Sequence, residues 1–135
     1  MTLDAAGASA PPLSPAETRY LLTIYQLSGD GSAVRSVDVA AALGVSRASV
    51  SKMLHSLAER GLILKEYYGN IRLTAPGVRQ ANELCTKVLL LENFFQRRLG
   101  LESALARQDA VASLCFLSVQ STEKLAQLVL DGQKP

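Results

Sequence analysis

The stretch from residue 46 to residue 55 combines short hydroxyl side chains with cationic ones, a composition suited to contacts with nucleic acid. The members expected on the outside of a helix are Ser46, Arg47, Ala48, Ser49, Ser51, Lys52 and His55. Short side chains let a helix approach base edges and phosphates, and arginine and lysine pair with phosphate oxygens or guanine acceptors. The pattern predicts a helix that enters the major groove by its N-terminal end, where the helix dipole also favours a phosphate.

Positive charge is concentrated around this stretch. Between Gly44 and Arg79 there are six basic residues and two acidic ones, whereas the whole chain carries a net charge of only +2. A phosphate-binding face requires such a local excess of positive charge. Taken by itself, however, the charge is explained equally well by an ordinary solvated surface.

Two short helices joined by a tight turn would position these side chains. The first is expected over residues 36–43 with Ser36 as its cap, and the second over residues 47–60 with Ser46 as its cap. Gly44 allows the backbone reversal between them. The small or apolar residues that would fill the space between the helices are Val39, Ala40, Leu43, Val45, Val50, Met53, Leu54 and Leu57. This order predicts a helix-turn-helix, a unit that also occurs in protein–protein modules.

Residues 62–67 and 70–73 read as two short strands, with a glycine-containing turn at residues 68–70. A hairpin after a helix-turn-helix predicts a wing, in which the candidates for phosphate contacts are Lys65, Tyr67, Tyr68 and Arg72. For Tyr67 and its neighbour Tyr68, ordinary strand packing is an equally good interpretation.

The remaining elements are helical. Ser14 and Glu17 form a predicted capping box for a helix that extends to about Leu27. Three further helices are expected over residues 75–99, 105–117 and 121–130. The predicted fold class is mainly α. Residues 1–13 are expected to be a disordered tail, 14–74 a winged helix-turn-helix domain and 75–135 a helical dimerisation domain.

Several function classes are excluded or disfavoured by the residues that are absent. The chain has one histidine and shows no nucleophile elbow, phosphate loop or clustered acid pair, so an enzyme is not expected. It shows no signal peptide and no apolar run long enough for a membrane span, which favours the cytoplasm. Cys85 and Cys115 have no metal or redox spacing.

A set of positions extends from the first predicted helix through the helix-turn-helix and the wing: Tyr20, Leu21, Ile24, Tyr25, Leu27, Asp38, Val39, Ala40, Leu43, Val45, Ser46, Ser49, Val50, Ser51, Met53, Leu54, Leu57, Gly61, Leu62, Ile63, Leu73, Thr74 and Gly77. In residue type and spacing these positions resemble the diphtheria toxin repressor and manganese transport regulator family of metal-dependent transcriptional repressors. The resemblance covers residues 14–131 and implies a homodimer that binds a palindromic operator in double-stranded DNA, with Mn or Fe(II) as the family's cofactor. The apolar content of the last three helices independently favours a partner, although a self-contained helical core would also account for it.

The resemblance also places the metal ligands, and here the residue types differ from the family pattern. The first-helix positions fall on Arg19 and Leu22, the long-helix position on Val88, and the next helix supplies Val111, Leu114 and Cys115. Of these only Cys115 has a suitable donor atom, and Glu92 lies one turn from Val88. One thiol and one carboxylate do not make a manganese or iron site.

The sequence therefore predicts a dimeric, sequence-specific DNA-binding regulator, most simply a repressor, that needs no cofactor. One alternative is a metal-responsive repressor with unconventional ligands, and another is an interaction module that no longer binds DNA. A thiol-based sensor at Cys85 or Cys115 is a further possibility, but a buried cysteine acting as a small apolar residue is the commoner case.

Overall fold

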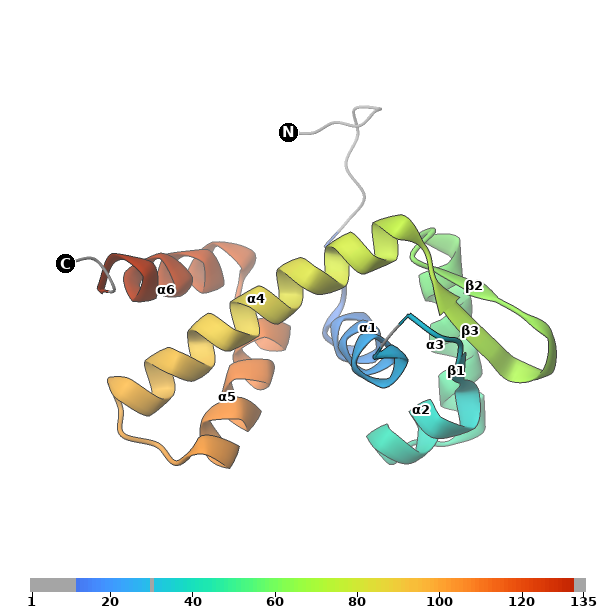
Figure 1. Cartoon of the computed structure of the whole chain (residues 1–135), viewed down its shortest axis with the longest axis horizontal. Helices are drawn as coiled ribbons and strands as arrows, with labels where there is room; N and C mark the ends of the chain where they lie inside the picture. The colour runs from blue at the N-terminus through green and yellow to red at the C-terminus, as the bar shows by residue number, and fades with distance from the viewer. Residues whose placement is uncertain (1–11, 30, 133–135) are drawn as a thin grey trace.

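A computed structural model describes residues 12–29 and 31–132 and is mainly α-helical, as predicted (Figure 1). The predicted tail lies largely outside these residues. The elements in chain order are α1 (Pro15–Ser28), β1 (Val34–Arg35), α2 (Ser36–Leu43), α3 (Arg47–Glu59), β2 (Ile63–Lys65), the 3-10 turn η1 (Tyr67–Gly69), β3 (Asn70–Leu73), α4 (Ala75–Arg97), α5 (Ser103–Phe116) and α6 (Val119–Gly132). No helix in the described part of the chain combines the length and apolarity needed to cross a bilayer.

The predicted helix-turn-helix is confirmed as α2 and α3, and local hydrogen bonds explain its limits. Gly44 adopts the left-handed conformation (φ 66°) that ends α2, and the Ser46 hydroxyl accepts a hydrogen bond of 3.1 Å from the Ser49 amide at the start of α3. The expectation that Ser36 caps α2 was wrong. Ser36 is already the first helical residue, because the extended backbone of Arg35 leads straight from β1 into the helix.

The wing is a three-stranded antiparallel sheet in the order β1-β3-β2, with one strand more than the sequence predicted. Val34 of β1 pairs with Ile71 of β3, which in turn pairs with Lys65 of β2. The predicted strand over residues 62–67 is shorter, because Tyr68 takes a left-handed backbone conformation (φ 62°) in η1. The turn therefore begins one residue earlier than expected.

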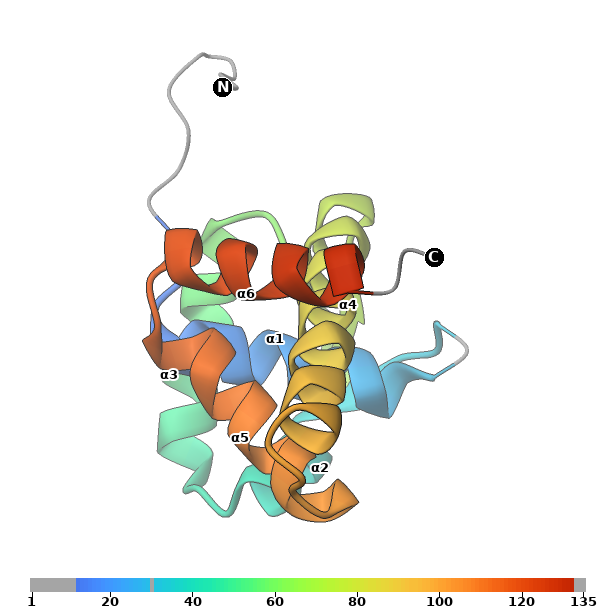
Figure 2. The same ribbon diagram turned by 90° about the vertical axis from the view of Figure 1, so that its left-hand side faces the viewer.

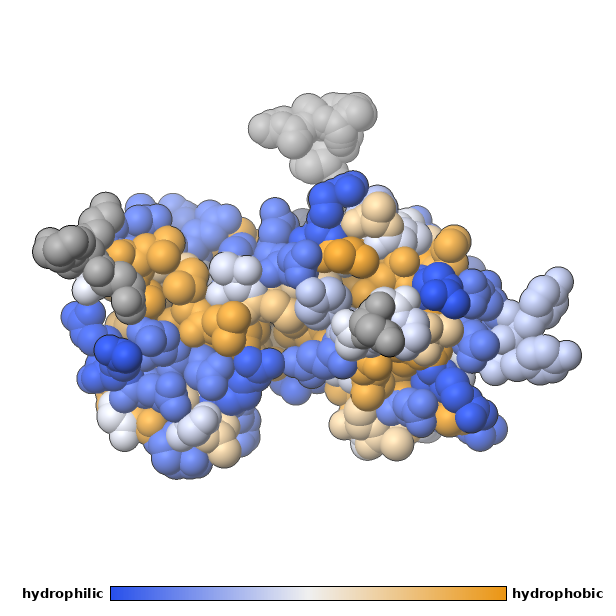
Figure 3. Space-filling view, viewed as in Figure 1, coloured by the Kyte–Doolittle hydropathy of each residue, from blue (hydrophilic) through white to orange (hydrophobic). Residues whose placement is uncertain are grey.

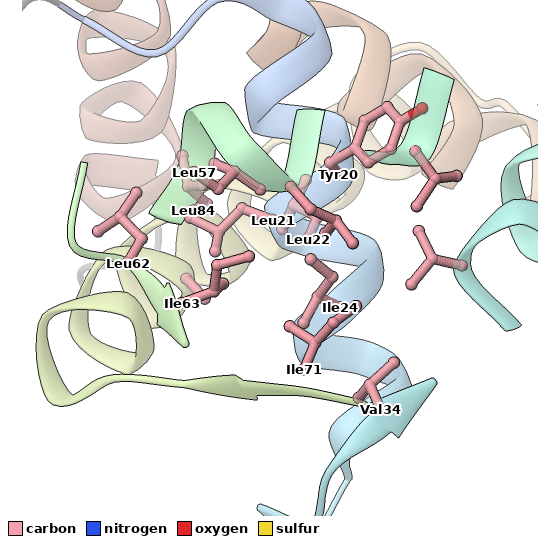
Figure 4. Packing of buried hydrophobic residues seen from close by; sticks show 14 of the residues in the cluster. Tyr20, Leu21, Leu22, Ile24, Val34, Leu57, Leu62, Ile63, Ile71 and Leu84 are labelled. Carbon is pink, nitrogen blue, oxygen red and sulfur yellow. The ribbon is translucent and has the colours of Figure 1, made fainter. Parts of the chain in front are cut away.

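One buried cluster joins the helix-turn-helix, the sheet and α4. Figure 4 shows Leu21 and Ile24 of α1 beside Leu57 of α3, Ile63 and Ile71 of the sheet and Leu84 of α4. The cluster continues along α4 with Val88 and Leu91. The buried core thus runs across the predicted domain limit between residues 74 and 75.

The junction between the wing and α4 is held by Thr74 and Gly77. The Thr74 hydroxyl donates a hydrogen bond to the Gly61 carbonyl (2.7 Å) and accepts one from the Gly77 amide (3.0 Å). A Cβ atom at Gly77 would lie only 2.0 Å from the Leu62 carbonyl oxygen, so only glycine permits this approach. From this junction α4 extends across the molecule, and α5 and α6 pack against it (Figures 1 and 2).

Candidate nucleic-acid interface

Helix α3 has one buried face and one exposed face, as its sequence pattern predicted. Val50, Leu54 and Leu57 are buried against the rest of the winged helix. The predicted contact residues on this helix are all exposed, namely Ser46, Arg47, Ala48, Ser49, Ser51, Lys52 and His55. The helix therefore presents a continuous polar and cationic surface to solvent, beginning at its N-terminus.

The N-terminal turn of α3 keeps donors available for an anion. The Ser46 hydroxyl is engaged in the cap, since it accepts from the Ser49 amide and donates to the Ser49 hydroxyl oxygen at 3.0 Å. Ser49 can still donate its own hydroxyl proton outward. The amides of Arg47 and Ala48 lie in the first turn, where a helix offers no internal acceptor. Ser46 thus acts mainly by holding this turn in place.

A hollow lies between the N-terminal half of α3 and the sheet of the wing. Three cations from three different elements line it: Arg35 of β1, Arg47 of α3 and Lys65 of β2. The one acidic residue in its lining is Glu66, and Ser51 supplies a hydroxyl. This convergence creates a positive field suited to a phosphate group.

Sequence reasoning missed Arg35. The residue reaches the hollow only because β1 pairs with β3, which places Arg35 opposite Asn70. A strand of two residues has no readable periodicity, so the available signal was a basic residue directly before the predicted helix-turn-helix.

The tip of the wing exposes two aromatic rings. Tyr67 is 87% exposed and Tyr68 is 98% exposed, so the interpretation of these residues as ordinary strand packing was wrong. Both rings line a shallow surface with Lys65 beyond the end of the sheet. This arrangement places Lys65, Glu66 and two phenol groups on one exposed surface of the wing.

Two predicted contact residues have partners within the protein. Arg72 pairs in register with Leu64, on the sheet face opposite Ile71, and its Nε lies 3.3 Å from Oε2 of Glu66. His55 Nε2 lies 3.4 Å from Oε2 of Glu59, one helical turn along α3. The structure therefore brings Lys65 to the α3 side of the wing and leaves Arg72 on the outer side.

Glu17 anchors α3 to α1. Its carboxylate accepts hydrogen bonds from Arg60 Nε (2.9 Å) and from the Ser56 hydroxyl, while its other oxygen accepts from the Ser14 amide. Burial would raise the pKa of Glu17, but these hydrogen bonds and the charge of Arg60 outweigh it and lower the pKa from 4.5 to about 2. The orientation of the exposed helix is thus fixed by a buried, ionised carboxylate.

The positions at which the resemblance places metal ligands lie around α1, α4 and α5. Arg19 is exposed, Leu22 and Val88 are buried in apolar surroundings, and Val111 and Leu114 pack against the core. Glu92 is paired with Arg107, whose Nη1 lies 3.3 Å from Oε1 of the carboxylate.

The thiol of Cys115 is buried among the same helices. Burial raises the pKa of this thiol, and the charge of Arg19 opposes that effect only in part. Because the pKa is raised, the thiol stays protonated at neutral pH. Among residues 12–29 and 31–132, no three His, Cys, Asp or Glu side chains gather closely enough to hold a metal ion.

Comparison with known sequences identifies relatives over most of the chain. Residues 13–71 match the family model described as the iron dependent repressor, N-terminal DNA binding domain. The chain is 30% identical over 116 residues to the HTH-type transcriptional regulator MntR of Lysinibacillus sphaericus, covering 86% of this chain and 83% of that protein. It is 40% identical over 91 residues to the transcriptional regulator MntR of Escherichia coli O157:H7, but this match spans only 58% of that protein's length and 67% of this chain.

Solved structures with the same fold agree with this grouping. The manganese regulator SloR superimposes with a TM-score of 0.71 at 26% identity, and the metal-dependent transcriptional regulator MtsR with a TM-score of 0.73 at 25% identity. They cover 87% and 88% of this chain, which corresponds in each case to 55% of the other chain. The sequence matches over the winged helix and the shared fold beyond it show that the chain belongs to the iron-dependent repressor family that includes the MntR regulators, a family of transcriptional regulators and not of enzymes.

Proposed function

We propose that this protein is a sequence-specific transcriptional regulator, acting as a repressor, that binds double-stranded DNA through α3. The observation that carries the proposal is the exposed cationic surface of α3 together with the hollow formed by Arg35, Arg47 and Lys65. The N-terminal half of α3 would enter the major groove, where Arg47 and Lys52 would reach base edges or phosphates. The exposed wing tip at Tyr67 and Tyr68 would contact the adjacent backbone. Residues 14–74 would thus be the DNA-binding domain, and the cytoplasmic location stays a prediction.

We further propose that residues 75–135 hold two copies of the chain together. Large apolar side chains are exposed on all three C-terminal helices or at their ends, including Leu89, Phe116, Val119 and Leu128. Figure 3 shows apolar residues gathered on the surface over α4 and α6. Covering such side chains with a second copy removes them from water and presents two reading helices to the two halves of a palindromic operator.

The regulator would act without the metal site of its family. The residues at the expected ligand positions do not fit a manganese or iron ion, because a guanidinium repels a cation and Leu22, Val88, Val111 and Leu114 have no donor atoms. The two nearest donors also serve other purposes, since Glu92 is paired with Arg107 and Cys115 is buried as a thiol. The alternative is a metal-responsive repressor with unconventional ligands.

Selection of bound duplexes from a random DNA pool, with either EDTA or MnCl₂ present, tests specificity, symmetry and metal dependence in one experiment. The expected result is the same palindromic consensus in both arms. Fluorescence anisotropy with that consensus should then show affinity that falls steeply with salt, because phosphate contacts release counterions. Calorimetry with Mn²⁺, Fe²⁺, Zn²⁺ and Co²⁺ should show no saturable micromolar binding.

A matched pair of variants separates a specific contact from a general loss of positive charge. Arg47→Gln should weaken binding at least about tenfold, the loss expected for a charge-assisted contact. Arg97→Gln, which removes an exposed arginine from the last turn of α4, should leave the affinity unchanged. Enrichment of no sequence, together with salt-independent or absent DNA binding, would favour the interaction-module alternative. A consensus found only with MnCl₂ would favour the metal-responsive one.

A further inference from the structure

A second hollow lies between α1, α2 and α5, away from the proposed DNA-binding surface. Its polar lining includes Arg19 and Gln26 of α1 and Arg107 and Gln108 of α5. Its apolar lining includes Leu22 and Val111, and further small or apolar residues come from α2 and α5. The outline of the molecule in Figure 3 is indented between the part formed by α5 and the part formed by α2.

The charge of this hollow is positive. Two arginines line it from opposite helices, and no acidic residue is among the side chains that line it. Arg19 is exposed and forms no ion pair within the part of the chain that the structure describes. Arg107 is partly neutralised by Glu92, but its guanidinium has further donors that this one contact at 3.3 Å does not use. The available hydrogen-bond donors therefore exceed what the protein itself satisfies.

The apolar part of the lining limits the size and kind of ligand. Leu22 is buried, and Val111 and Leu43 are half-buried at the same hollow. A small inorganic anion would leave this apolar surface in contact with water, whereas a neutral apolar molecule would leave the arginines without a partner. A short carbon chain that ends in a carboxylate satisfies both, because it combines apolar contact with bidentate hydrogen bonding to a guanidinium.

We propose that this hollow is the binding site for a small organic carboxylate with a short aliphatic body, held by Arg19 and Arg107. The bound molecule would bridge α5 to α1 and α2, and α2 is the first helix of the helix-turn-helix. Such a bridge would fix the position of the helix-turn-helix relative to the C-terminal helices. The consequence for DNA affinity rests on the proposed function, whereas the binding of the carboxylate does not.

The test uses sodium hexanoate as the probe and follows amide shifts of the ¹⁵N-labelled full chain. The expected result is a saturable shift at residues of α1, α2 and α5 around the hollow, with weaker or unsaturated shifts for hexanol and hexylammonium chloride. Arg19→Gln should weaken hexanoate binding about tenfold, because a charge-assisted pair is lost. This variant removes an exposed side chain and should fold normally. Arg107→Gln should have a similar effect, and Arg97→Gln, outside the hollow, should have none.

Three results would overturn the proposal: no saturable shift, shifts centred elsewhere, or equal affinities for hexanoate and hexanol. Unchanged hexanoate affinity in Arg19→Gln would overturn it as well. A second arm measures affinity for the selected operator with and without saturating hexanoate at constant ionic strength, and a change of severalfold in either direction is expected. If operator binding is absent while hexanoate still saturates the hollow, the proposed function fails and the binding site stands. If operator binding is normal and hexanoate does not bind, the proposed binding site fails and the proposed function stands.

Discussion

Arg60, the residue that ends α3, lies with its Nε 2.9 Å from Oε2 of Glu17 in α1, and Glu17 is almost fully buried. The same carboxylate closes the capping box with Ser14 and accepts a hydrogen bond from Ser56. One side chain thus starts the first helix and also fixes the helix proposed to contact DNA. Because the pairing with Arg60 needs the ionised carboxylate, the stability of the winged helix depends on the charge of Glu17.

Replacement of Glu17 by Gln should lower the free energy of unfolding by about 2–3 kcal/mol, because Arg60 loses a charged partner in a partly buried site. Urea unfolding followed by circular dichroism at pH 7 measures the loss. Glu83→Gln, at an exposed position of α4, is the control and should change the free energy by less than about 0.5 kcal/mol. Equal effects of the two substitutions would contradict this role of Glu17.

The stability of the native chain should also depend on pH through Glu17. The folded-state pKa of about 2 lies below the ordinary value of 4.5, so the unfolded chain takes up this proton first as the pH falls. The stability contributed by Glu17 is therefore fully present above about pH 5 and is lost as the pH falls from there toward 2. Urea unfolding between pH 7 and pH 3 should show a steeper decline for the native chain than for Glu17→Gln. Parallel declines would count against the depressed pKa.

Gly77→Ala should destabilise the junction between the wing and α4. The added Cβ would meet the Leu62 carbonyl oxygen at 2.0 Å, and backbone atoms at that distance must move apart. The expected cost is about 3 kcal/mol or more, the upper range for overpacking. Gly132→Ala is the matched control, since the nearest atom to its Cβ is the end of the Arg98 side chain at 3.8 Å. Thermal unfolding of both variants checks the prediction, which fails if Gly77→Ala melts like the native chain.

Arg35 and Arg72 should contribute unequally to DNA binding, although both are exposed arginines of the same small sheet. Arg35 lines the hollow with Arg47 and Lys65, whereas Arg72 is not part of its lining and pairs with Glu66. Arg35→Gln should weaken operator binding about three- to tenfold. It should also reduce the slope of log affinity against log salt concentration by the amount that corresponds to about one phosphate contact. Arg72→Gln should have the smaller effect on both quantities. Anisotropy titrations at several salt concentrations measure them, and the opposite ranking would show that DNA contacts Arg72 in preference to the hollow lined by Arg35.

Charged substitutions on the exposed apolar surface of the C-terminal helices should disrupt the proposed dimer. Leu89 is 60% exposed and Phe116 is 73% exposed, so a lysine at either position should cost little in the monomer. Leu89→Lys and Phe116→Lys are expected to raise the dimer dissociation constant at least about tenfold in sedimentation equilibrium, because a buried lysine loses hydration. Leu64→Lys, at an equally exposed leucine of the wing, is the control. A native chain that sediments as a monomer at micromolar concentration would contradict the proposal.

Sequence pattern alone determined the elements whose ends depend on residues three or four positions apart. The capping box of Ser14 and Glu17, the Ser46 cap and the left-handed Gly44 each involve neighbours in the chain, so their residue types suffice to locate α1, α2 and α3. The exposed side of α3 follows from the same helical spacing. The residues proposed to read DNA on this helix could therefore be named before the structure was known.

Tertiary structure decided every feature that depends on residues distant in the chain. The pairing of Val34 with Ile71 creates β1 and brings Arg35 to the hollow that Arg47 and Lys65 also line, and no local pattern of two residues predicts it. The packing of α5 near α1 likewise places Arg107 and Arg19 at one hollow. Such contacts form because burying apolar surface selects one arrangement of the helices as a whole, and that selection depends on the entire core and not on the short segments that meet.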